Sequence, residues 1–168
     1  MEHAIVFAET GHLCLSTLHA TSANQALDRV VNFFSEDRRQ QLLLDLSLNL
    51  RAIIAQRLIP RRDGQGRQVA VEVLINTPLV ADLLLKGEIP TLKEVMRRST
   101  DEGMKTFDQS IYELYCADII SETDALHYAD SANDVRLMIK RNKESKVNPE
   151  DAVFRPMDTG TRLNAGTR

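Results

Sequence analysis

Residues 53–75 determine the fold class, and they read IIAQRLIPRRDGQGRQVAVEVLI. Two apolar runs flank a polar turn that contains two glycines. In the second run, aliphatic side chains occupy alternate positions, at Val69, Val71, Val73 and Ile75. Alternation of this kind is the period of a β-strand, and two strands joined by a short glycine-containing loop form an antiparallel hairpin. The sequence therefore predicts a hairpin here.

The segments before the hairpin predict helices around one short strand. Glu2–Glu9 has the pattern of a helix, and Gly11 supplies its stop. Leu13–Leu18 is a run of small and apolar residues between turn signals, which is typical of a buried, parallel strand. Two helices follow, one to about Phe33 and one to about Leu50, with N-caps at Thr21 or Ser22 and at Ser35.

The segments after the hairpin predict helices alone, which makes the chain an α/β protein. Thr77-Pro78 is a cap followed by proline at the first helical position, and Gly87 ends that helix. Further helices are expected at Thr91–Arg98 and Thr106–Ala117, and after capping boxes at Ser121–Asp124 and Ser131–Asp134. Residues 142–168 hold few large apolar side chains, so we expect a disordered tail.

Composition restricts the class of protein. A chain of 168 residues suits one domain and excludes a multidomain enzyme. The net charge of −3 gives no electrostatic case for nucleic-acid binding. No apolar run approaches the ~20 residues that span a bilayer, and no secretory signal opens the chain. Cys14 and Cys116 lie in apolar segments, so we expect reduced, buried thiols in a cytosolic protein.

Two histidines bracket the expected strand, His12 before it and His19 after it. In open α/β sheets, ligands bind beyond the carboxyl ends of the strands. An imidazole placed there can donate to a phosphate or order an attacking water, and Thr17 adds a hydroxyl from the same strand. A purely structural role for the histidines is the alternative interpretation. Their spacing, with no cysteine or carboxylate cluster nearby, predicts no metal site.

Several stretches carry a family resemblance. Thr10–Leu13 and Ser16–His19 together resemble the His box of the secretion ATPase superfamily, and in particular of the PilT/PilU branch that powers type IV pilus retraction. Residues 24–34, 53–74 and 103–121 resemble later segments of the same family, in the same order. The similarity extends over residues 4–141.

Two details make the chain more similar to the PilU type than to the PilT type. Residues 130–140 resemble the PilU form of the last helix. In the retraction branch, a short helix carries two arginines, and this chain has Ala81 and Leu85 at those positions.

The resemblance implies a fold, a chemistry and a setting. It implies the C-terminal part of a RecA-like P-loop NTPase core with the hairpin at residues 1–76, a helical region at 77–141 and the tail at 142–168. It implies that His12, Thr17 and His19 face the nucleotide phosphates and the catalytic water in an ATPase that uses ATP and Mg²⁺. A homo-hexamer or an assembly with related motor ATPase subunits, docked on an inner-membrane platform protein in the bacterial cytoplasm, is the implied setting.

The sequence contains no G-x-x-x-x-G-K-[ST] motif to cradle a β-phosphate. We therefore expect a partial chain that neither binds ATP tightly nor hydrolyses it alone. A non-enzymatic module that binds full-length motor subunits is the alternative, and an independent hydrolase built on the two histidines is disfavoured because no nucleophile or carboxylate pair accompanies them. The strand at residues 13–18 would lack neighbours, so poor solubility or partner dependence is expected for the first 60 residues.

Overall fold

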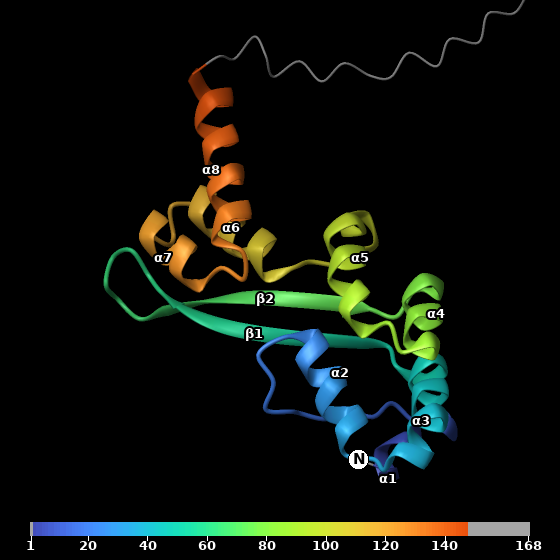
Figure 1. Ribbon diagram of the computed structural model, residues 1–168. Helices are drawn as coiled ribbons and strands as arrows, with labels where there is room; N and C mark the ends of the chain where they lie inside the picture. Colours follow the sequence, from blue (N-terminus) through green and yellow to red (C-terminus); the bar gives the residue numbers. More distant parts are fainter. Residues whose placement is uncertain (1, 148–168) are drawn as a thin grey trace, which may run out of the picture.

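An antiparallel hairpin runs through the middle of the protein, as the computed structural model shows for residues 2–147 (Figure 1). Its strands are β1 (Ala52–Pro60) and β2 (Arg67–Ile75). The register pairs Ala52 with Ile75 and Pro60 with Arg67, so the predicted hairpin is confirmed. A single bridge between Val73 and Lys105 extends the pairing beyond β2. The outer edge of β1 pairs with no other strand of residues 2–147.

Eight helices surround the hairpin within residues 2–147. They are α1 (Glu2–Glu9), α2 (Ala23–Asn32), α3 (Glu36–Asn49), α4 (Pro78–Lys86), α5 (Leu92–Arg98), α6 (Phe107–Cys116), α7 (Glu122–Tyr128) and α8 (Ala132–Val147). Short 3₁₀ turns occupy Ile89–Thr91 and Thr100–Glu102. In Figure 1, α3 and α4 lie at the open end of the hairpin, whereas α6 and α7 lie toward its turn.

Local cap chemistry sets the ends of these helices. Ser22 accepts a hydrogen bond from the Gln25 amide and begins α2, as one of the two predicted caps. Thr77 caps α4 in the same way, and that helix ends at Gly87, whose φ of 72° lies in the left-handed region that glycine favours. The predicted boundaries of α1, α4 and α6 hold to within a residue or two.

One face of the hairpin provides most of the core. At its open end Leu74 packs against α2, α4 and α5, and toward its turn Ala55, Ile59 and Ala70 pack against α6, α7 and α8. Removing these side chains from water is the main stabilising contribution. The other face keeps large apolar side chains in solvent, since Ile54 is 70% exposed and Leu58 is 54% exposed.

The expected strand at Leu13–Leu18 is wrong. Residues 12–20 have no regular secondary structure, and Leu13 and Leu15 are 78% and 90% exposed. A strand needs a neighbour to pair its backbone groups, and this segment pairs with no strand within residues 2–147. The buried position expected for Cys14 fails for the same reason, because the residue is exposed.

Two further expectations need correction. Cys116 is exposed because it lies at the last position of α6, and it is not the core thiol that its apolar surroundings suggested. The expected tail begins too early, because α8 continues to Val147. The rest of that expectation concerns residues 148–168, which lie outside the described residues. The division of the chain at residues 76 and 141 remains a prediction.

Candidate functional site

The segment that carries the predicted site residues connects α1 to α2. His12, Thr17 and His19 are all exposed on it. His12 is held at the end of α1, because its backbone amide donates to the Phe7 carbonyl at 3.1 Å and its Nδ1 lies 3.0 Å from the Thr10 hydroxyl. The Phe7 ring meets the imidazole edge-on, with 5.8 Å between the ring centroids. These contacts fix the backbone at His12 and leave the ring open to solvent.

The other end of the segment is anchored by the start of α2. Thr21 donates its backbone amide to the Gln25 side-chain oxygen at 2.6 Å, and the Ser22 hydroxyl accepts from the Gln25 amide at 3.2 Å. The Ala23 amide donates to a Glu72 carboxylate oxygen at 2.7 Å. His19 therefore lies a few residues before a firmly held helix start.

A groove separates this segment from the hairpin. Its volume is about 430 Å³. Residues of the segment, among them Ser16, Thr17 and Leu18, line one side, and residues 52–56 of β1 line the other. Thr17 is the one predicted site residue that lines the groove. The structure thus places the three residues on one short segment. Among the contacts of residues 2–147, no hydrogen bond joins any two of them.

A second polar site joins the hairpin to the helices after it, and sequence reasoning missed it. Arg57 on β1 donates to the Tyr128 carbonyl and pairs with Asp130 at 3.0 Å. Its guanidinium lies over the Phe107 ring, 4.2 Å from the centroid. Lys93 on α5 holds the other Asp130 oxygen at 2.8 Å. No short motif signals this site, because Arg57 and Asp130 are 73 positions apart.

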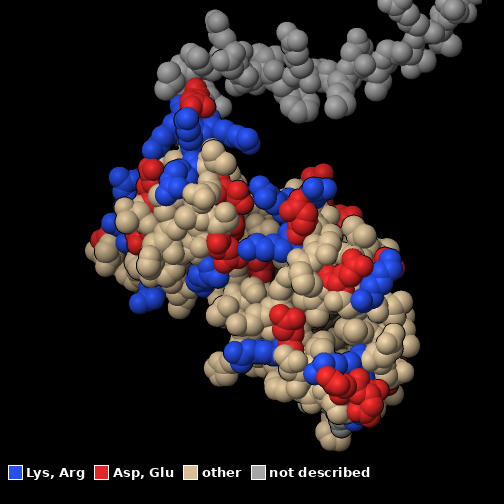
Figure 2. Space-filling view, viewed as in Figure 1, with Lys and Arg blue, Asp and Glu red and all other residues tan. Residues whose placement is uncertain are grey.

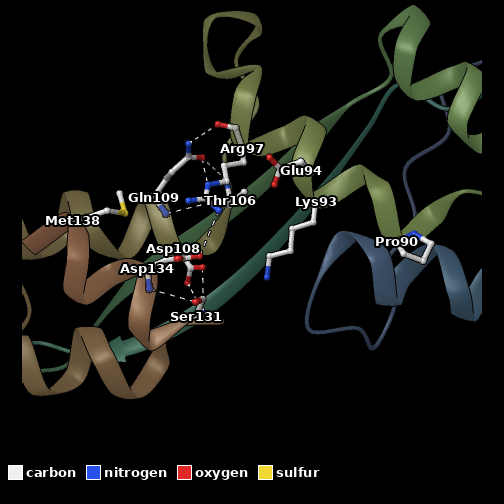
Figure 3. A pocket seen from close by; sticks show the side chains of 10 residues that line it. All are labelled: Pro90, Lys93, Glu94, Arg97, Thr106, Asp108, Gln109, Ser131, Asp134 and Met138. Atoms are coloured by element: carbon white, nitrogen blue, oxygen red, sulfur yellow. Dashed lines mark hydrogen bonds and ion pairs between the residues drawn. The ribbon is translucent and has the colours of Figure 1, made fainter.

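Asp108 completes the second polar site. Its carboxylate is buried and accepts from the Asp130 amide at 2.8 Å and from the Ser131 amide at 3.3 Å. Figure 3 shows Asp108 beside Ser131. Burial raises the pKa of Asp108, and the two amides act in the opposite direction. Burial also acts to raise the pKa of Asp130, but Lys93 and Arg57 outweigh it and lower that pKa. Arg57 and Lys93 pair with Asp130, and backbone amides satisfy Asp108, so the arrangement fits a structural junction.

The surface around these sites carries mixed charge. Basic and acidic side chains lie among one another on the face shown in Figure 2. Residues 2–147 contain no group of three or more His, Cys, Asp or Glu side chains that could hold a metal ion. Within the same residues, no helix is both long and apolar enough to cross a membrane.

Comparison with known proteins identifies the family. Residues 1–147 match the family described as "Type II/IV secretion system protein". The chain belongs to this family. It is 61% identical to the type IV pilus ATPase PilU of Pseudomonas aeruginosa over 145 residues. This alignment covers 86% of the chain and 38% of PilU. It is 34% identical over 122 residues to the type IV pilus retraction ATPase PilT of the same organism, covering 73% of the chain and 35% of PilT.

Solved structures agree with this assignment. The pilus retraction motor PilT, solved with bound ADP, aligns with a TM-score of 0.70 and 32% identity over 79% of the chain and 37% of that protein. The Legionella pneumophila ATPase DotB aligns with a TM-score of 0.63 and 25% identity over 83% of the chain and 35% of DotB. The resemblance to the PilT/PilU branch and the partial RecA-like α/β fold are thus confirmed. The chain spans less than two fifths of the length of these relatives.

Proposed function

We propose that the chain is the C-terminal part of a PilU-type motor ATPase that couples ATP hydrolysis to type IV pilus dynamics. The observation that carries the proposal is the 61% identity to PilU over 86% of the chain. The likeness to PilT, which was solved with ADP, supports it. In this family member, His12, Thr17 and His19 supply the phosphate side of the nucleotide site.

The described residues do not make a complete nucleotide site. His12 and His19 are exposed, and only Thr17 lines the groove beside β1. The sequence contains no P-loop motif, so the backbone cradle for the phosphates must come from polypeptide outside this sequence. In the completed site, His19 can order the attacking water, and the Thr17 hydroxyl can donate to a phosphate oxygen.

The assembly that follows from this function is also proposed. The chain acts in a hexamer, or together with related motor subunits, against the platform protein at the cytoplasmic side of the inner membrane, with ATP and Mg²⁺ as ligands of the completed enzyme. The open edge of β1 and the exposed Ile54 and Leu58 side chains support a dependence on further polypeptide, because such edges pair readily with other chains. The same features favour the second candidate, a module that binds full-length motor subunits without hydrolysing ATP.

A chimera tests the proposal. Residues 1–147 replace the matching part of P. aeruginosa PilU, and ATP turnover and nucleotide binding are measured with and without His19→Ala. We expect turnover to fall by about 100-fold while binding persists, the usual scale for loss of a group that acts in proton transfer. His127→Ala, an exposed histidine of α7, is the matched control and retains turnover. Normal turnover in the His19→Ala chimera would refute the assignment, and an inactive chimera that still binds full-length PilU would favour the module.

A further inference from the structure

Glu72 is an acidic residue in the interior of the protein. It lies in the middle of β2, and only 1% of its surface is exposed. A buried carboxylate is costly unless hydrogen bonds replace its lost water. The nearest replacement is the Ala23 amide, which donates to Glu72 Oε1 at 2.7 Å. Ala23 is the first residue of α2 and lies four positions after His19.

A second helix start lies near the same carboxylate. The backbone amide of Phe107, the first residue of α6, lies close enough to act on Glu72 and favours its ionised form. Free amides and the helix dipole make the N-terminus of a helix favourable for negative charge. Glu72 therefore lies near two helix starts that are far apart in the sequence, and it accepts a hydrogen bond from the first of them.

The surroundings show why a neutral side chain does not replace this carboxylate. A carboxylate has two acceptor oxygens and no donor, so it can satisfy both amides. A glutamine amide has one acceptor oxygen and an NH₂ group, which would face one of the two backbone N–H groups. Burial raises the pKa of Glu72, with the Ala23 amide opposing it, and the charges of Asp130 and Lys93 lie close enough to act on it.

We propose that Glu72 is a positioning residue that ties the start of α2 to β2 and thereby fixes where the His19 segment leaves the core. The consequence for catalysis rests on the function proposed above. A displacement of β2 is passed through one carboxylate to Ala23, and from there along residues 19–22 to the histidine. No contact between Glu72 and nucleotide is required.

Asp108 provides a matched control for a merely structural role. It is also a buried carboxylate on this side of the protein, and it accepts two backbone amides, those of Asp130 and Ser131. The Asp130 and Ser131 amides directly precede α8, so they do not connect to α2. Loss of a buried charge as such should therefore act alike in Glu72→Gln and Asp108→Asn, whereas loss of the link to the His19 segment should appear only in the first.

The first experiment uses the 168-residue chain and nuclear magnetic resonance. We expect Glu72→Gln to speed hydrogen exchange of the Ala23 amide by about tenfold, because a neutral acceptor replaces the charged one, and to shift the amide signals of residues 17–22. Asp108→Asn should leave both unchanged. If Glu72→Gln does not fold, Glu72→Asp, which withdraws the carboxylate by one methylene, should give the same exchange increase. Unchanged Ala23 exchange in the folded variant, or equal changes in Asp108→Asn, would overturn the proposal.

The second experiment uses the PilU chimera and separates this inference from the proposed function. Glu72→Gln should lower kcat by about tenfold with KM within about twofold, because a misplaced His19 affects the reaction more than nucleotide binding. Asp108→Asn should change kcat by less than about twofold. A loss confined to KM would overturn the positioning role. A chimera without turnover, combined with the expected exchange result, would leave the link at Ala23 standing and refute the ATPase assignment.

Discussion

Arg57→Ala tests whether the second polar site holds the hairpin to the C-terminal helices. The Arg57 side chain is only 24% exposed, and its guanidinium lies 4.2 Å from the Phe107 ring centroid and pairs with Asp130 at 3.0 Å. A partly desolvated cation–π contact contributes about 1–2 kcal/mol, and a hydrogen bond to a charged group about 1.5–3 kcal/mol. These terms overlap, and Lys93 still holds Asp130 in the variant. We therefore expect the free energy of unfolding to fall by about 3 kcal/mol.

The assay is urea unfolding of the chain followed by circular dichroism. Arg62→Ala is the control, because its partner Asp118 lies at the surface and such pairs contribute about 0–1 kcal/mol. Arg57→Lys keeps the charge but loses the planar stacking surface, so it should lie between Arg57→Ala and the wild type. A loss below about 1 kcal/mol for Arg57→Ala, or one no larger than that of Arg62→Ala, would refute this account of the junction.

Two further predictions concern the helix ends and the acid response. Gly87→Ala should lower the free energy of unfolding by about 1 kcal/mol, because φ at Gly87 is 72° and the new Cβ contacts only Leu43, at an ordinary 3.5 Å. Asp118→Gly is the control, because Asp118 has a φ of 59° and glycine adopts this conformation without strain, so it should not destabilise the protein. Urea midpoints measure both effects. Asp130→Asn should destabilise at neutral pH. Folding lowers the pKa of Asp130, so its charge stabilises the folded protein above the unfolded pKa near 3.8, and this stabilisation is lost as pH falls through the folded pKa. The difference in urea midpoint between wild type and Asp130→Asn should therefore be constant down to about pH 5 and close below pH 3.8.

The parts of the fold that depend on local chemistry followed from the sequence. The hairpin shows its period of two within a few residues, and Thr77 with Pro78 identifies a helix start by itself. The family resemblance likewise depended on short ordered motifs. The sequence did not reveal which face of β2 is buried. The buried face carries Glu72 and Leu74, whereas Val69 is 37% exposed. The helix start that satisfies Glu72 comes from a distant segment, so the strand's own sequence does not show it.

The parts that depend on distant segments did not follow. The Leu13–Leu18 strand was expected from its apolar composition, but a strand forms only beside another strand, and composition does not show whether one is present. The second polar site joins Arg57 to Asp130 across 73 positions without any shared motif. The roles of His12, Thr17 and His19 stay predictions, because all three are exposed and only Thr17 lines the groove beside β1.

The paired register of the hairpin restricts how this protein can move. Sliding β1 by one residue against β2 would turn Arg57 into solvent, along with the rest of the core face, and would bury Ile54 and Leu58 in its place. Such slippage would break the junction to α7 and α8 in one step. A motion that displaces the hairpin relative to His19 while this register holds must therefore move β1 and β2 together.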